Sequence, residues 1–423
     1  MALPLGALLT LAASACMQGE DSAIDGRRAT HASDAEPALP GSALEEPAAE
    51  DDIEGSDAGS SDAGTALASG PTWAPPHHAA LPLQPLGDGL HAYLPHRPGA
   101  HRLKGSGHTH SAPDHSDISP RAQEERLRDL PGPHAHGFVW LTGHNFVAPD
   151  PGVSGIQHMF GIEAYSAKQP QSGVEPHVLA YLPDGALADP SERPLGYFEH
   201  DINEINALVQ DVGGVTAWAH PSRQPLTDEE LASIDGLWGM EVVSGATDVE
   251  ANLAFVDRRL GMGHYVCLTG GGDIHAEDYR LTRGYQLVEV QSAEPTREEL
   301  FTEVAACNFF VCETKDTDVD PIEPPRLSVE GNHLTVTLPR AADSIRFIGD
   351  GGAVLSETRD ADTASYAPRR ADRYVRVEIR AEAGQAACYS QPTWLVDDAD
   401  VHDGAVDDGD VDDGDPEGDS PVR

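Results

Sequence analysis

The chain has 423 residues, with 71 acidic side chains against 27 basic ones and a formal net charge of −44 at pH 7. This length allows two domains or one large one. The negative charge argues against bulk electrostatic binding to DNA, RNA or anionic lipid. Half of the charge lies in two segments, 17–70 and 397–423, so the rest of the chain is less extreme.

The N-terminal residues have the pattern of an export signal. An apolar and small-residue run from Leu3 to Ala15 ends in Ala-Ser-Ala-Cys, which resembles a bacterial lipoprotein cleavage site with Cys16 as the lipidated residue. The run is too short for a stable transmembrane helix. We expect residues 1–16 to be a signal on an exported cell-envelope lipoprotein that touches the membrane only through Cys16. The lack of Lys or Arg before the run leaves open an ordinary apolar N-terminus.

Residues 17–70 hold no aromatic residue and are rich in Ala, Ser, Gly, Asp and Glu. Such a segment cannot bury enough apolar surface to fold, so we predict a disordered acidic linker. Four cysteines remain beyond Cys16, and an even number is compatible with disulfides in an exported protein. The sequence does not reveal how they pair. They are Cys267, Cys307, Cys312 and Cys388.

From about residue 100 to 315, strand-like apolar runs alternate with helical stretches. Helix starts are predicted at Ser119-Pro120 and at capping boxes beginning at Thr227 and Thr296, and 201–212 has helical spacing before Gly213. This alternation indicates a mainly parallel sheet, open or closed into a barrel. The predicted strands are Phe138–Thr142, Met159–Ala164, His177–Leu182, Val215–His220, Gly239–Val243, Tyr265–Thr269 and Tyr285–Val290.

A histidine-rich segment, GSGHTHSAPDHSDISP, runs from Gly105 to Pro120. On a strand, His108 and His110 would point to the same face, because side chains alternate with period two. Imidazole and carboxylate groups bind zinc, manganese or iron, so this pair is a candidate chelate. Further metal-binding side chains collect at the ends of the predicted strands, where parallel α/β folds build their active sites. These are His144, Glu163, His177, His220, Asp273 and His275.

Five motifs in order resemble the PHP superfamily, named after polymerase and histidinol phosphatase domains. They are HTH at 108–110, TGHN at 142–145, GIE at 161–163, AHP at 219–221 and DIH at 273–275. The resemblance implies an α/β fold, a distorted seven-stranded (β/α) barrel, which we place at residues 71–315. It also implies two or three divalent metal ions; the donor types favour zinc, manganese or iron.

Carried over motif by motif, the resemblance implies nine metal-binding side chains, with Glu163 bridging two of the ions. His115 takes the place where many relatives have an aspartate. Gly143 replaces the usual aspartate before the second motif's histidine, so Gly143→Asp is expected to be neutral or to raise activity. The implied ligands are His108, His110, His115, His144, Glu163, His177, His220, Asp273 and His275.

Divalent ions that acidify a bound water and neutralise a phosphoryl group would make the protein a metal-dependent phosphoesterase. We predict hydrolysis of a small phosphomonoester by a metal-activated hydroxide at a trinuclear site, with Glu163, Asp273 and Arg223 as the catalytic residues. One alternative is a nuclease-type phosphodiesterase, against which the acidic charge counts. The other is a non-catalytic, metal-dependent surface binding protein. The oligomeric state cannot be predicted.

After Cys312 the pattern changes to short alternating runs separated by Gly, Asp and Pro. We predict a small all-β sandwich at 320–396. The remaining segment, 397–423, repeats Val-Asp-Asp-Gly-Asp. Its spacing does not match a calcium-binding EF-hand loop, which favours a disordered acidic tail.

Overall fold

The computed structural model describes part of the chain. The predicted signal and acidic linker, most of the acidic tail, and His115 lie outside the described residues. No helix in the described part is long and apolar enough to cross a membrane. The described residues are 83–113, 116–185, 200–245, 247–275, 281–316 and 318–398.

The α-helices of the described residues begin where the sequence predicts helix starts or follow an Asp cap. At α1 the side chain of Ser119 accepts a hydrogen bond from a backbone amide, and at α3 the full capping box of Thr227 is present. At α5 only half of the predicted box forms, because Glu299 accepts from the backbone of Gln291 instead of that of Thr296. The helices are α1 (Pro120–Arg128), α2 (Ile202–Asp211), α3 (Asp228–Ala232), α4 (Val249–Gly261) and α5 (Arg297–Ala305).

Seven strands, β3 to β9, lie side by side in chain order. Most neighbours run parallel, but β6 runs antiparallel to both β5 and β7. The strand runs predicted from sequence all lie in this set or in β10. The seven are β3 (His101–Thr109), β4 (Phe138–His144), β5 (Gln157–Tyr165), β6 (His177–Leu182), β7 (Val215–Trp218), β8 (Gly239–Val243) and β9 (Cys267–Gly270).

The α/β class is as predicted, but a clear closed barrel is not found in the described residues. Between the ends of the set there is only one isolated parallel bridge, from Thr109 to Ile274. The first half of β3 instead pairs antiparallel with β10 (Gly284–Val290), which pairs with β11 (Phe309–Thr314). β3 thus pairs with β4 on one side and with β10 on the other, and the sheet continues from β10 to β11.

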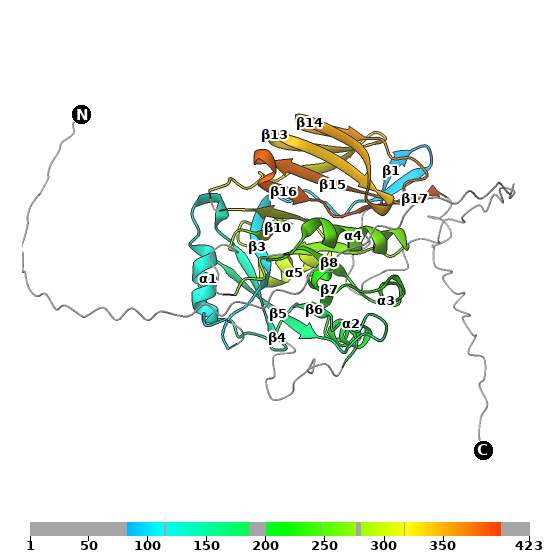
Figure 1. Ribbon diagram of the computed structural model, residues 1–423. Helices are drawn as coiled ribbons and strands as arrows, with labels where there is room; N and C mark the ends of the chain where they lie inside the picture. Colours follow the sequence, from blue (N-terminus) through cyan, green and yellow to red (C-terminus); the bar gives the residue numbers. More distant parts are fainter. Residues whose placement is uncertain are drawn as a thin grey trace, which may run out of the picture. The chain divides into compact units, whose positions relative to one another are not determined.

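The C-terminal strands are part of the same 17-stranded sheet of the described chain. β16 pairs with β11, and β17 pairs with β2, so the strands predicted as a sandwich continue this sheet through hydrogen bonds. Figure 1 shows blue β1 among the orange and red C-terminal strands. The strands of this region come from both ends of the described chain. They are β1 (Leu83–Gly87), β2 (Leu90–Tyr93), β12 (Arg326–Glu330), β13 (His333–Gly349), β14 (Ala353–Tyr366), β15 (Tyr374–Ala381), β16 (Ala386–Tyr389) and β17 (Thr393–Asp397).

The described residues form two larger apolar cores and a third, smaller one around Leu127 and Leu141. The first core contains Trp140, Trp218 and Trp238, and the second contains Ile345 and Phe347; all are essentially inaccessible to solvent. The first core fills the α/β part and supports the strand ends that carry the histidines. Burial of large aromatic side chains is the main contribution to holding such an arrangement.

The four cysteines within the described chain form two disulfides, a pairing that the sequence left open. Cys267 of β9 is bonded to Cys307, and Cys312 of β11 to Cys388 of β16. The second pair occupies directly opposed positions of the β11–β16 ladder. It therefore links the α/β part to the C-terminal strands covalently.

Candidate metal centre

The end of β3 delivers two histidines to a buried site. His108 and His110 are both 0% exposed, and their Nε2 atoms lie 3.0 Å apart. The backbone there is closely packed, since a Cβ on Gly271 would lie 2.2 Å from the amide nitrogen of His108. A glycine next to β9 is thus required for this approach.

Glu163 of β5 is the centre of the site. It lies opposite His144 in the parallel ladder of β4 and β5. Its Oε2 is 3.2 Å from His108 Nε2, 3.1 Å from His110 Nε2 and 2.9 Å from His144 Nε2. Its Oε1 is 2.8 Å from His177 Nδ1 and 2.9 Å from His220 Nε2. Five imidazole rings at or just beyond the ends of β3, β4, β6 and β7 therefore surround one carboxylate.

Asp273, in the segment after β9, closes the other side of the site. Its Oδ1 lies 3.3 Å from His110 Nε2 and 3.6 Å from His108 Nε2. Its Oδ2 accepts a hydrogen bond from Arg223 Nη1 at 3.3 Å. The Arg223 side chain is 59% exposed, so it stands between the buried site and solvent.

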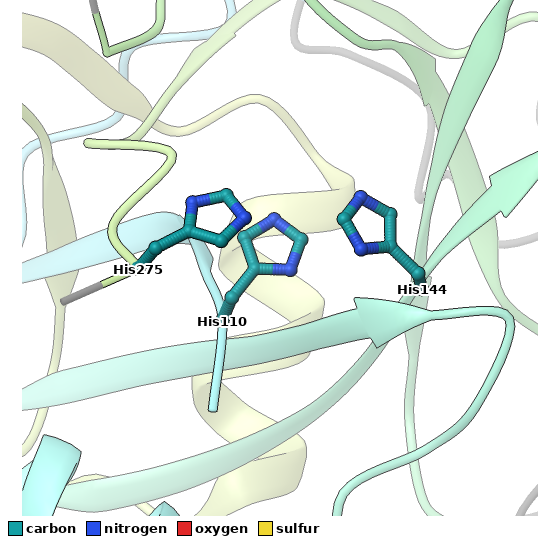
Figure 2. A group of neighbouring side chains, drawn as sticks. All are labelled: His110, His144 and His275. Atoms are coloured by element: carbon teal, nitrogen blue, oxygen red, sulfur yellow. The ribbon is translucent and has the colours of Figure 1, made fainter. Parts of the chain in front are cut away.

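A second group of rings forms the more open side. Figure 2 shows His110, His144 and His275 gathered in one place from separate segments. His110 stacks on His275 with ring centroids 4.1 Å apart, and on His144 at 4.4 Å. The side chains of His144 and His275 are 12% and 20% exposed, whereas His110 is buried. A ligand therefore reaches the site past these partly exposed rings.

Glu241 of β8 belongs to the site and was missed in the sequence analysis. It is fully buried; its Oε1 lies 2.9 Å from His108 Nδ1, and its Oε2 accepts the backbone N–H of His220 at 3.0 Å. A carboxylate accepts hydrogen bonds, so Glu241 holds a proton on His108 Nδ1 and leaves Nε2 to bind either a second proton or a metal ion. The available signal was an acidic residue inside the apolar run Gly239–Val243.

The donor set fits a cation. His108 Nε2 faces the Glu163 carboxylate at 3.2 Å, a distance that requires a proton or a metal ion between the two atoms. Burial opposes a charge on His108, but the carboxylates of Glu241 and Glu163 outweigh it and raise the pKa of His108 well above its ordinary value. Burial also opposes ionisation of Glu163, yet the adjacent histidines hold its pKa well below the usual range. The site thus favours bound positive charge.

Three groups of described residues have ligand atoms close enough to share an ion. The sets overlap at His110, His144 and Glu163, as expected of a site for more than one ion. Burial lowers the pKa values of His177 and His275, which keeps these rings neutral and able to coordinate metal. The groups are His108, His110, Glu163 and Asp273; His144, Glu163 and His177; and His110, His144 and His275.

The backbone is strained at three positions in or beside the site. His220, Asp273 and Asn145 have φ values of 32°, 46° and 57°, in the left-handed region that L-residues avoid. Such conformations persist where the surroundings hold them, and they are concentrated at functional sites. At His220 the hydrogen bond from its backbone amide to Glu241 helps to hold this conformation.

The space beside Gly143 bears on the expected effect of Gly143→Asp. A Cβ at this position would lie 2.3 Å from Cε1 of Phe146, and 2.4 Å from its Cζ. The ring of Phe146 thus occupies the space that an aspartate would need. Gly143→Asp therefore requires this partly exposed ring to move aside.

The structure brings eight of the nine proposed ligands together, and His115 lies outside the described residues. Arg223 lies at the site, as predicted from its position after the His-Pro pair.

No model of a known protein family matches the chain, and no curated protein matches it. Two solved structures are similar to it. A Bifidobacterium adolescentis protein named as a metal-dependent phosphoesterase has 18% identity and a TM-score of 0.31, covering 43% of this chain and 90% of its own. An amidohydrolase from Chromobacterium violaceum, with bound sulfate and no metal, has 13% identity and a TM-score of 0.32, covering 48% and 95%. TM-scores this low do not establish a common fold.

Proposed function

We propose that the chain is a metal-dependent phosphoesterase of the PHP type that hydrolyses a small phosphomonoester. The observation that carries the proposal is the convergence of five imidazole rings on Glu163, next to Asp273. Hydrogen bonding alone does not account for this number of donors, because a carboxylate has about four lone-pair sites. Divalent ions account for it.

Glu163 and Asp273 would hold the ions with the histidines around them, and His115 would complete a trinuclear site. Bound ions there would acidify a water to a pKa of about 7 and neutralise a phosphoryl oxygen. Glu241 keeps His108 in the tautomer that presents Nε2 to the site. Buried Glu163 and Asp273 give the centre a fixed negative charge, which selects cations.

Arg223 is the group best placed to bind substrate. Its guanidinium is exposed, and its hydrogen bond to Asp273 keeps it at the edge of the centre. Guanidinium pairs with phosphate through two parallel hydrogen bonds. A single arginine suits a small phosphomonoester better than a nucleic acid, which is bound through many phosphates.

The two disulfides support the export part of the proposal. Disulfides persist mainly in oxidising compartments, and both pairs here are buried between structural elements. We propose that the protein acts in the bacterial cell envelope, anchored through a lipid on Cys16.

The test is hydrolysis of p-nitrophenyl phosphate by metal-loaded protein, with elemental analysis of the same sample. We expect two or three zinc, manganese or iron ions per chain and turnover that a chelator abolishes. Bis-p-nitrophenyl phosphate hydrolysed faster than the monoester would favour the nuclease-type alternative. Bound metal without turnover of either ester would leave the binding protein as the better description, and less than about one ion per chain after reconstitution would exclude a multinuclear site.

A further inference from the structure

A cavity of about 410 Å³ lies where β10 and β3 meet the chain that leads into β12. Its walls include Lys104, Tyr285, Leu287, Ile322 and several prolines. Small-molecule sites commonly have about 300–1,000 Å³, apolar walls and a few polar groups. Lys104 comes four residues before His108 on β3, which at about 3.3 Å per residue puts the cavity roughly 13 Å from the metal centre.

Lys104 brings a positive charge into this cavity without a carboxylate partner among the described residues. Its Nζ lies 4.0 Å from the centroid of the Tyr285 ring and donates to the carbonyl of Pro133 at 3.3 Å. Burial lowers the pKa of Lys104 to about 7, which reflects the cost of an ammonium group removed from water. Burial, and then the charge of Lys104, also lower the pKa of His136 nearby.

The other charged groups at the cavity do not neutralise Lys104. Glu323 forms an ion pair with Arg340 at 2.8 Å, and Asp320 is exposed at the rim. Lys104 is half-buried and its Nζ reaches the surface, so an anion placed beside it forms a charge-assisted hydrogen bond that is partly shielded from water. Since Arg340 pairs with Glu323, the carboxylate of Asp320 is the rim charge that would repel a dianion such as phosphate more strongly than a monoanion.

We propose that this cavity binds a small organic monoanion, a carboxylate on an aromatic or apolar body. The carboxylate pairs with Lys104 Nζ, and the body packs against Pro133, Pro321 and Pro324 of the cavity wall. This is a second ligand site, separate from the metal centre and independent of the proposed phosphoesterase activity.

The test uses benzoate as the probe and benzyl alcohol as its neutral counterpart, titrated calorimetrically into the full chain. We expect benzoate to bind at least about tenfold more tightly, because a hydrogen-bonded charge contributes about 1.5–3 kcal/mol. Lys104→Gln should lose that difference and Lys104→Arg should keep part of it. Lys168→Gln is the matched control, since Lys168 is an exposed lysine elsewhere.

Proton linkage gives a second measurement that needs no variant. An anion raises the pKa of Lys104, so benzoate binding at pH 8 should take up close to one proton, and affinity should fall as pH rises above about 7. Titrations in buffers with different ionisation enthalpies measure this uptake. Equal binding of benzoate and benzyl alcohol, unchanged affinity in Lys104→Gln, or loss of binding when metal is removed would each overturn the proposal.

Discussion

At the scale of single residues, Glu163 and Glu241 have different roles in the candidate metal centre. Glu163 faces the space between the rings, and Glu241 lies behind His108 and His220. One carboxylate would contact the ions, and the other fixes the atoms that do. Partners behind the ligands commonly matter to metal affinity nearly as much as the ligands do.

Glu163→Gln should reduce phosphomonoester hydrolysis by about a hundredfold or more and lower the metal content, because an amide cannot neutralise two cations. Elemental analysis and steady-state kinetics with added manganese or zinc measure both effects. Glu229→Gln is the control, since Glu229 is exposed on α3. Wild-type turnover in Glu163→Gln would remove the basis for the proposed function.

Glu241→Gln should weaken metal binding by about 10–100-fold while the protein stays folded. Either the Nδ1–H of His108 or the amide of His220 then loses its acceptor, because one oxygen becomes an NH₂ donor. Competition with a chromophoric chelator measures the metal dissociation constant. An affinity equal to that of the wild type would show that Glu241 has no orienting role.

Gly143→Ala should destabilise the fold by about 1–3 kcal/mol, because the new Cβ overlaps the ring of Phe146. Gly261→Ala, at a position with open space, is the matched control. Urea denaturation compares the two. Adding Phe146→Ala to Gly143→Ala should cost less than the sum of the single changes, since the two residues share one space. Strict additivity would contradict the packing explanation, as would a stable Gly143→Asp.

At the scale of elements, β3 serves two regions of the molecule. Its first half pairs with β10 and lines the Lys104 cavity, and its end places His108 and His110 in the metal centre. β11 likewise belongs to two regions, since it pairs with β10 on one side and with β16 on the other. Because each of these strands is paired in two regions, it fixes the position of one region relative to the other.

Replacing Cys312 and Cys388 together by serine should destabilise the protein by about 2–5 kcal/mol, mainly because the unfolded chain gains freedom. The two cysteines are 76 residues apart in sequence. Denaturant titration of this variant against wild type measures the effect. A thiol assay on unfolded, unreduced wild-type protein should detect none of the four cysteines of the described chain; four titratable thiols would contradict the pairing.

At the scale of the whole described chain, the C-terminal strands and the α/β part form one sheet with buried charge contacts across it. Arg376 of β15 is 2% exposed and pairs with Asp257 of α4 at 2.7 Å. Breaking such a pair leaves an uncompensated buried charge. We therefore expect the described residues to unfold in a single transition.

Truncation after Asp398 should leave the melting temperature within a few degrees of the full chain, because the removed segment is almost devoid of apolar residues. Asp397 must be kept, since β17 pairs it with Leu90 of β2. Truncation before Thr393 is the control and should lower the melting temperature strongly by removing β17. Differential scanning calorimetry compares the three chains; a large loss after Asp398 would show that the tail contributes to folding.

The sequence by itself determined the local features of this protein. Helix starts at Ser119 and Thr227, the positions of β4 to β10 and the types of metal-binding side chain follow from short-range patterns, whereas β3 and β11 were not among the predicted strands. Caps and side-chain alternation depend on neighbours within a few residues, so they can be read along the chain. The motif order also indicated which distant residues would meet, and the structure brings eight of those nine together.

Only the tertiary structure decided the features that depend on contacts between distant segments. Glu241 gains its role from His108, which is 133 residues away. Phe146 takes the space beside Gly143, the cysteines pair across β11 and β16, and Lys104 lines a cavity closed by the chain before β12. The physical reason is that packing and electrostatics act between atoms that are close in space, whatever their separation along the chain, and a local pattern does not encode those neighbours.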